Sequence, residues 1–166
     1  MLDWTDAVLR LVCAAVIGAL IGLDRDLRGK PTGVRTLGIV SLGSAAIVLA
    51  SQYPAHATDT AAASRVMQGI ITGIGFLGAG VILRNPKADK ADGPSVEKVR
   101  GMTTAASIWL TACIGASCGA GAWPVVITSA VLVTLLLTLG RSIERTFERL
   151  LPPRSAAEDE SGPEGW

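Results

Sequence analysis

The sequence has few aromatic residues, few charges and a single histidine. Aromatic residues make up 4% of the 166 residues and charged residues 17%, whereas hydrophobic residues reach 49%. A net charge of +1 and the lack of a basic patch interleaved with aromatics exclude nucleic acid as a partner. The three cysteines lie in apolar segments without metal-ligand companions, which excludes a zinc site or a disulfide framework.

The sequence is instead rich in long apolar segments. Five of them occupy about 4–23, 36–52, 66–83, 103–119 and 122–140. Each has about the length that a helix needs to cross the hydrocarbon core of a bilayer. They predict an all-α membrane protein, a compact bundle of about five transmembrane helices. This domain covers 1–151, with 141–151 as a cytoplasmic helix extension, and the acidic segment 152–166 is predicted to be a disordered tail.

The basic residues predict how the bundle lies in the membrane. All but two of the 15 lysines and arginines follow the first, third or fifth apolar segment, the exceptions being Arg10 and Arg65. The positive-inside rule places those three segments in the cytoplasm. We therefore expect the N-terminus outside and the C-terminus in the cytoplasm. Arg10 and Asp6 are four residues apart, so we expect them to pair on one helix face.

The stretch from Gly69 to Arg84, GIITGIGFLGAGVILR, is the most distinctive in the chain. Gly73, Gly75 and Gly78 spell G-x-G-x-x-G, which marks a dinucleotide site when it joins a strand to a helix. Here apolar residues flank the glycines, and the segment is long enough to span a bilayer. Small residues in such a helix let neighbouring backbones approach closely. We therefore expect this stretch to be the packing centre of the bundle.

Polar and small residues inside the other segments leave two interpretations open. Pairs of glycines four residues apart, at Gly18 and Gly22, Gly69 and Gly73, and Gly115 and Gly119, favour a compact bundle or a homo-oligomer. The midspan polar residues are Ser41, Ser44, Thr72, Ser107 and Thr111. Such hydroxyl groups either join helices by hydrogen bonds or line an ion pathway.

Two predicted cytoplasmic loops share a short pattern. Lys30-x-x-Gly33-Val-x-Thr36 matches Lys98-x-x-Gly101-Met-x-Thr104, and each stands directly before an apolar segment. The match favours a duplicated helical hairpin, with the two copies related by an axis along the membrane normal, as in some transporters. The alternative is that each pattern is a helix start whose threonine caps the first N–H groups.

The sequence offers few candidate metal-binding or catalytic residues. Asp24 and Asp26 are the candidate metal ligands, because divalent cations prefer carboxylate oxygens. They alternate with Arg25 and precede Arg28, so ion pairing at the membrane surface is the alternative. We find neither an activated nucleophile nor an acid–base pair, so the sequence predicts a protein that is not an enzyme and holds no cofactor.

Three blocks, in order, resemble the signature of the MgtC/SapB family of bacterial inner-membrane proteins. They are GLDRDLRGKPTGVRTLGIVSLG, RVMQGIITGIGFLGAGVILR and VRGMTTAASIWLTACIGASCGAG, within about 18–121. The resemblance implies a small multi-pass protein linked to growth under magnesium limitation and to survival inside host cells. It also implies regulation of another membrane complex, the ATP synthase, with transport of magnesium or another divalent cation as the alternative function. The resemblance implies such a complex as a partner. The apolar segments predict the lipid bilayer as another, and the glycine pairs favour a second copy of the chain.

The resemblance also implies which positions matter. They are Arg25, Asp26, Lys30, Gly33, Arg35 and Thr36 in the first block, Gly73, Gly75, Phe76, Gly78, Gly80 and Arg84 in the second, and Arg100, Gly101, Thr103 and Thr104 in the third. Asp26 stands where the family usually has a glutamate. Longer members carry a soluble C-terminal domain, whereas about 25 residues follow the last apolar segment here. We therefore expect a short form without that domain.

The predicted orientation is tested by placing a cysteine at Ala88, in a variant whose native cysteines are replaced. If the loop after the third segment is cytoplasmic, a membrane-impermeant thiol reagent leaves this cysteine unlabelled in intact cells and labels it after permeabilisation. Labelling in intact cells would invert the orientation.

Overall fold

The computed structural model describes residues 3–52, 60–83 and 101–150, and every regular element in these ranges is a helix. The helices are α1 (Trp4–Leu27), α2 (Val34–Ser51), α3 (Thr60–Leu83), α4 (Met102–Gly119) and α5 (Trp123–Leu150). The prediction of an all-helical protein with five helices is confirmed. Residues 152–166, predicted to be a tail, lie outside the described residues.

Four of these helices, α1, α2, α3 and α5, are each long and apolar enough to cross a membrane. The remaining helix, α4, has 18 residues, as many as α2. It is less apolar because hydroxyl side chains stand where aliphatic ones would otherwise be. It packs against three helices, α1, α2 and α3, and only α2 among the described helices has as many such neighbours. Three of its hydroxyl groups, those of Thr104, Ser107 and Thr111, are buried and therefore face protein rather than lipid.

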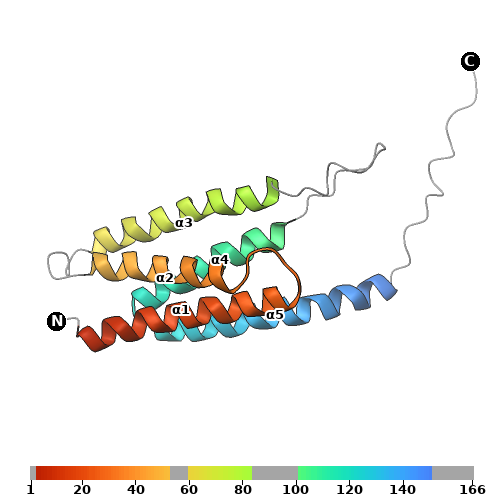
Figure 1. Cartoon of the computed structure of the whole chain (residues 1–166), viewed down its shortest axis with the longest axis horizontal. Coiled ribbons are helices and arrows are strands. Elements are labelled where there is room, and N and C mark those ends of the chain that lie inside the picture. The colour runs from red at the N-terminus through yellow and green to blue at the C-terminus, as the bar shows by residue number, and fades with distance from the viewer. Residues whose placement is uncertain (1–2, 53–59, 84–100, 151–166) are drawn as a thin grey trace, which may run out of the picture. The chain divides into compact units, whose positions relative to one another are not determined.

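The chain divides into two compact units, Met1–Ala130 and Val131–Trp166. In the first unit, α1 and α2 form a hairpin that packs against α4, while α3 lies along α4 and also touches α2 (Figure 1). In the second unit, the described residues continue α5 as a single helix.

The core of the first unit is the place where α2 meets both α1 and α4. On α1, a Cβ added to Gly18 would lie 2.6 Å from the Leu37 carbonyl oxygen and from the Ser41 Cβ. On α4, a Cβ added to Gly115 would overlap the backbone of Ser41, and one added to Gly119 would overlap that of Ala45. Because real Cβ atoms essentially never come within 3.0 Å of such atoms, these glycines permit a backbone contact that no other residue allows.

The glycine-rich stretch of α3 is not the packing centre, contrary to the prediction from sequence. A Cβ added to Gly69, Gly73, Gly75 or Gly80 would meet nothing within 4 Å. Only Gly78 approaches a neighbour, with 3.4 Å to the Ala105 Cβ of α4. The reason is that α3 turns one side toward α4 and leaves most of its glycines on other sides. The close contacts are made by the glycine pairs of α1 and α4 instead.

We expect Gly115→Val to destabilise the folded protein by about 1–3 kcal/mol or more, because the added carbons overlap the Ser41 backbone and force the helices apart. Thermal unfolding of the detergent-solubilised protein measures the loss. The matched control is Gly43→Val, at an exposed glycine of α2 where an added Cβ meets nothing within 4 Å. Equal unfolding temperatures for the two variants would contradict the contact.

Candidate functional site at the end of the first hairpin

Arg25 is the centre of a polar cluster at the end of α1. Its side chain is buried, with 3% of the residue exposed. The guanidinium donates to the Thr32 carbonyl oxygen at 3.2 Å and to that of Pro31 at 3.1 Å. It also donates to the hydroxyl of Thr104, in the first turn of α4, at 2.6 Å. One side chain therefore ties the loop between α1 and α2 to the start of α4.

The loop that Arg25 holds has an unusual backbone. Thr32 has a φ of 64°, a left-handed conformation that β-branched residues rarely adopt. Gly29 has a similar φ of 60°, which glycine adopts without strain. The hydrogen bond from Arg25 to the Thr32 carbonyl contributes to holding the strained conformation in place.

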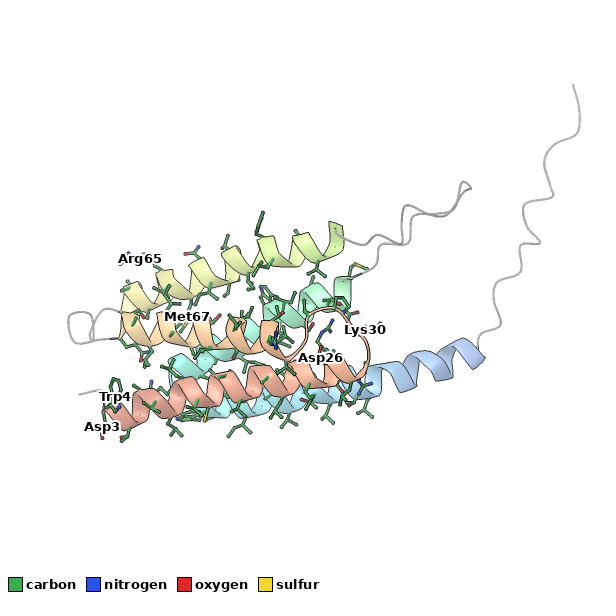
Figure 2. All side chains as sticks on the ribbon, in the orientation of Figure 1. Asp3, Trp4, Asp26, Lys30, Arg65 and Met67 are labelled. Atoms are coloured by element: carbon green, nitrogen blue, oxygen red, sulfur yellow. The ribbon has the colours of Figure 1, made fainter. Side chains whose placement is uncertain are left out.

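Asp26 caps the next helix. Its carboxylate accepts a hydrogen bond from the Val34 backbone N–H at 2.9 Å, in the first turn of α2. A negative charge is favourable there because helix N-termini carry partial positive charge. The carboxylate lies so close to Gly33 that any Cβ at that position would overlap it. Figure 2 shows Asp26 and Lys30 together at this end of the hairpin.

The two candidate metal ligands are both engaged with protein groups. Asp24 forms an ion pair with Arg28 at 2.6 Å, on the same side of α1. Asp26 caps α2, as described above. Among the residues that the structure describes, no group of three or more His, Cys, Asp or Glu side chains could hold a metal ion. The ion-pairing alternative is therefore the one observed for Asp24.

A line of hydroxyl groups follows the buried side of α4 away from Arg25. Ser107 donates to the Thr104 carbonyl oxygen at 2.8 Å, and Thr111 donates to that of Ser107 at 2.7 Å. Across the interface, the side-chain oxygen of Ser41 is buried without a hydrogen-bond partner. The hydroxyls of α4 are thus satisfied by their own helix, as serine and threonine often are inside helices.

The structure brings some of the family positions together and leaves others apart. Arg25 meets Thr104, and Gly101 lies beside α3, where an added Cβ would be 3.3 Å from the Val81 carbonyl oxygen. Four positions near the hairpin end are exposed, namely Lys30, Arg35, Thr36 and Thr103. Four positions on α3 have no close neighbour or are largely exposed, namely Gly73, Gly75, Phe76 and Gly80. Arg84 and Arg100 lie outside the described residues.

The repeated pattern corresponds to equivalent helix starts. Gly33 and Gly101 are the N-cap residues of α2 and α4, so each threonine of the pattern is the third helical residue. The capping role predicted for threonine is filled differently: at α2 the Asp26 carboxylate is the cap, and Thr104 instead accepts a hydrogen bond from Arg25.

A second polar cluster, which the sequence did not predict, lies at the other end of α1. Arg10 pairs with Asp6 at 2.7 Å, as predicted. It also donates to the Gly119 carbonyl oxygen at 3.1 Å, at the C-terminus of α4, and to the Gln52 side chain at 3.3 Å. Gly121, with a φ of 72°, leaves room for the guanidinium. The sequence did contain one sign of this cluster, the charged Arg10 inside an apolar segment, because a charged residue there requires a partner.

We expect Thr104→Val to destabilise the protein by about 1–3 kcal/mol, because the change removes a buried acceptor from Arg25. The neighbouring Thr103 is exposed, so Thr103→Val is the matched control and should stay within about 0.5 kcal/mol of the wild type. Denaturant unfolding in mild detergent measures both. A Thr104→Val variant as stable as the wild type would show that the contact with Arg25 contributes little to stability.

Comparison with known proteins identifies the family to which this chain belongs. The model of the MgtC family matches residues 11–146. Protein SrpB of Synechococcus elongatus is 38% identical over 175 residues, which cover 95% of this chain and 94% of SrpB. Protein MgtC of Salmonella typhimurium is 34% identical over 143 residues, which cover 86% of this chain and 56% of that protein.

A third relative is the Escherichia coli protein named putative magnesium transporter YhiD, 35% identical over 136 residues. These cover 78% of this chain and 58% of YhiD, so the chain spans little more than half the length of YhiD and of the Salmonella protein. No solved structure matches the chain. The family match and the helices long enough to cross a bilayer together show that this chain is a multi-pass membrane protein that belongs to the MgtC family.

Proposed function

We propose that this protein regulates another complex of the bacterial inner membrane by binding to it, without catalysing a reaction of its own. The family resemblance supplies the ATP synthase as the candidate complex. The protein is a rigid membrane-embedded scaffold whose exposed surfaces contact the partner, and its role belongs to the adaptation to magnesium limitation.

The observation that supports this proposal is the close packing of the protein interior and the engagement of its carboxylates. The α1, α2 and α4 backbones meet at Gly18 and Gly115 so closely that no Cβ fits between them. The carboxylates nearest the candidate site are engaged by Arg28 and by the Val34 N–H. A close-packed interior with engaged carboxylates supports a scaffold better than an ion pathway, because a pathway requires groups that are free to replace water around the ion.

The exposed cations at the hairpin end support a docking role. Lys30 and Arg35 are both exposed, and Arg25 and Asp26 fix the loop and helix start that carry them. Charges on a rigid rim steer association with a surface of opposite charge. We therefore assign the contact with the partner's acidic surface to this rim.

Transport of magnesium is the second candidate. The name of the YhiD relative favours it, and so does the line of hydroxyl groups along α4 that includes Ser107 and Thr111. In this alternative, Asp24 and Asp26 exchange their present partners for the ion at the pathway entrance.

Magnesium flux separates the two candidates. We expect liposomes that contain the purified protein and an internal magnesium dye to show no more flux than liposomes without protein. Asp24→Ala and Asp26→Ala variants should then behave as the wild type does. A protein-dependent flux that either substitution abolishes would contradict the scaffold function and support transport.

Regulation is measured with liposomes that contain the ATP synthase of the same bacterium, with or without this protein. We expect the protein to change ATP-driven proton pumping. The double variant Lys30→Glu, Arg35→Glu should need about tenfold more protein for the same effect, because like charges repel across the contact. The control is Lys30→Arg with Arg35→Lys, which keeps both charges and the effect. Pumping that is unchanged by the wild-type protein would exclude this complex as the partner.

A further inference from the structure

The loop between α1 and α2 holds the exposed Lys30 from both sides. The Lys30 backbone N–H donates to the Arg25 carbonyl oxygen at 3.0 Å. The next two residues, Pro31 and Thr32, accept hydrogen bonds from the Arg25 guanidinium through their carbonyl oxygens. Arg25 therefore binds the chain directly before and directly after Lys30, with its own carbonyl oxygen on one side and its guanidinium on the other.

Two further features restrict the same segment. A proline disfavours the helical conformation for the residue before it, so Pro31 limits the backbone of Lys30. Thr32 has a φ of 64°, which a β-branched residue keeps only where its surroundings determine it. The segment is thus held in one conformation in spite of local strain. Such strain is typical of segments whose particular shape serves a function.

The second exposed cation, Arg35, is held by the neighbouring residue of α1. The Val34 N–H, directly before Arg35 in the first turn of α2, donates to the Asp26 carboxylate at 2.9 Å. Asp26 in turn follows Arg25 on α1. The backbones that carry the two cations are therefore tied to two consecutive residues of one helix. The Cα atoms of Lys30 and Arg35 consequently keep a fixed spacing.

A rim of charges with a fixed spacing binds differently from a flexible cluster of charges. Ordering a flexible loop during binding costs free energy, and a pre-organised loop avoids that cost. A fixed spacing also discriminates between partners. Two carboxylates on a rigid protein surface bind well only where their spacing matches that of the cations, whereas mobile lipid headgroups adjust to any spacing. The rim formed by Lys30 and Arg35 therefore fits a pair of acidic side chains of a partner protein.

We propose that Arg25 is the positioning residue of this rim. By holding the segment from Lys30 to Thr32, it sets the spacing of Lys30 and Arg35 for a pair of acidic side chains on the partner. This inference rests on the proposed docking function and adds that charge alone is not sufficient for docking. A variant that keeps both cations but loses their spacing therefore binds weakly. The contact of Arg25 with Thr104 has a separate role, since it ties α1 to α4.

The spacing is measured without a partner. In a variant whose native cysteines are replaced by alanine, nitroxide labels at Lys30→Cys and Arg35→Cys report the distribution of distances between the two positions by electron paramagnetic resonance. We expect a narrow distribution that broadens when Arg25→Lys is added, because an ammonium group replaces the rigid fork that reaches both carbonyl oxygens. Adding Thr104→Val, which leaves those carbonyl oxygens in place, should keep the distribution narrow. A distribution that is broad from the start, or unchanged by Arg25→Lys, would refute the proposal.

The consequence for docking is measured by proton pumping in liposomes that contain the ATP synthase. We expect Arg25→Lys and Pro31→Gly each to need about three- to tenfold more protein for the half-maximal effect, although both variants keep Lys30 and Arg35. Pro31→Gly guards against a folding defect of Arg25→Lys, because Pro31 is exposed and glycine retains its carbonyl oxygen. Thr104→Val should match the wild type when equal amounts of folded protein are compared.

The outcomes separate this inference from the docking function on which it rests. If pumping responds to the charges of Lys30 and Arg35 but not to Arg25→Lys or Pro31→Gly, docking works by charge alone and the positioning role of Arg25 is wrong. If the wild-type protein leaves pumping unchanged, the ATP synthase is not the partner. The label distances then decide by themselves whether Arg25 sets the spacing of the rim.

Discussion

The first unit depends on the contact between the backbone of α2 and the glycines of α1 and α4. Gly18 and Gly115 approach the same residue, Ser41, one through its side chain and the other through its backbone. In a bilayer there is no hydrophobic force between helices, because lipid tails are as apolar as leucine side chains. Dispersion and weak Cα–H···O contacts at close range must therefore hold the helices, and both weaken steeply with distance. A single added methyl group at this crossing would be felt by all three helices.

Two arginines of α1 complete that arrangement by holding α4 at both ends. Arg25 donates to Thr104 in the first turn of α4, and Arg10 donates to the Gly119 carbonyl at the last turn. The second contact is electrostatically favourable, because the C-terminus of a helix carries partial negative charge. Near the membrane surface such contacts are stronger than in water, since fewer water molecules compete for the same groups. The contacts of Arg25 and Arg10 fix the register of α1 against α4, and the glycines between these two contacts fix the distance between the helices.

The local parts of this structure were predictable from sequence, and the long-range parts were not. The five helices follow from the length of the apolar segments, and the pairing of Asp6 with Arg10 follows from their spacing. The contact between Arg25 and Thr104 joins residues 79 positions apart, which no spacing rule reaches. The glycine pairs of α1, α3 and α4 look alike in sequence, so their pattern did not show which would be packed. The usable signal was the set of hydroxyl groups on α4, which marks a helix shielded from lipid.

The two sets of glycines therefore have different consequences for function. Those of α1 and α4 are fully occupied by contacts within the chain, so they account for stability. Those of α3 make no such contact with the residues that the structure describes, since side chains at Gly69 or Gly73 would meet nothing within 4 Å. A helix that faced only lipid would gain stability from larger residues there, because glycine weakens helices and buries little surface. Among the described residues, no packing contact accounts for glycine at Gly69 or Gly73. The part of the protein that tolerates no added atoms is therefore the contact of α2 with α1 and α4, where Gly18 and Gly115 leave no room for a Cβ.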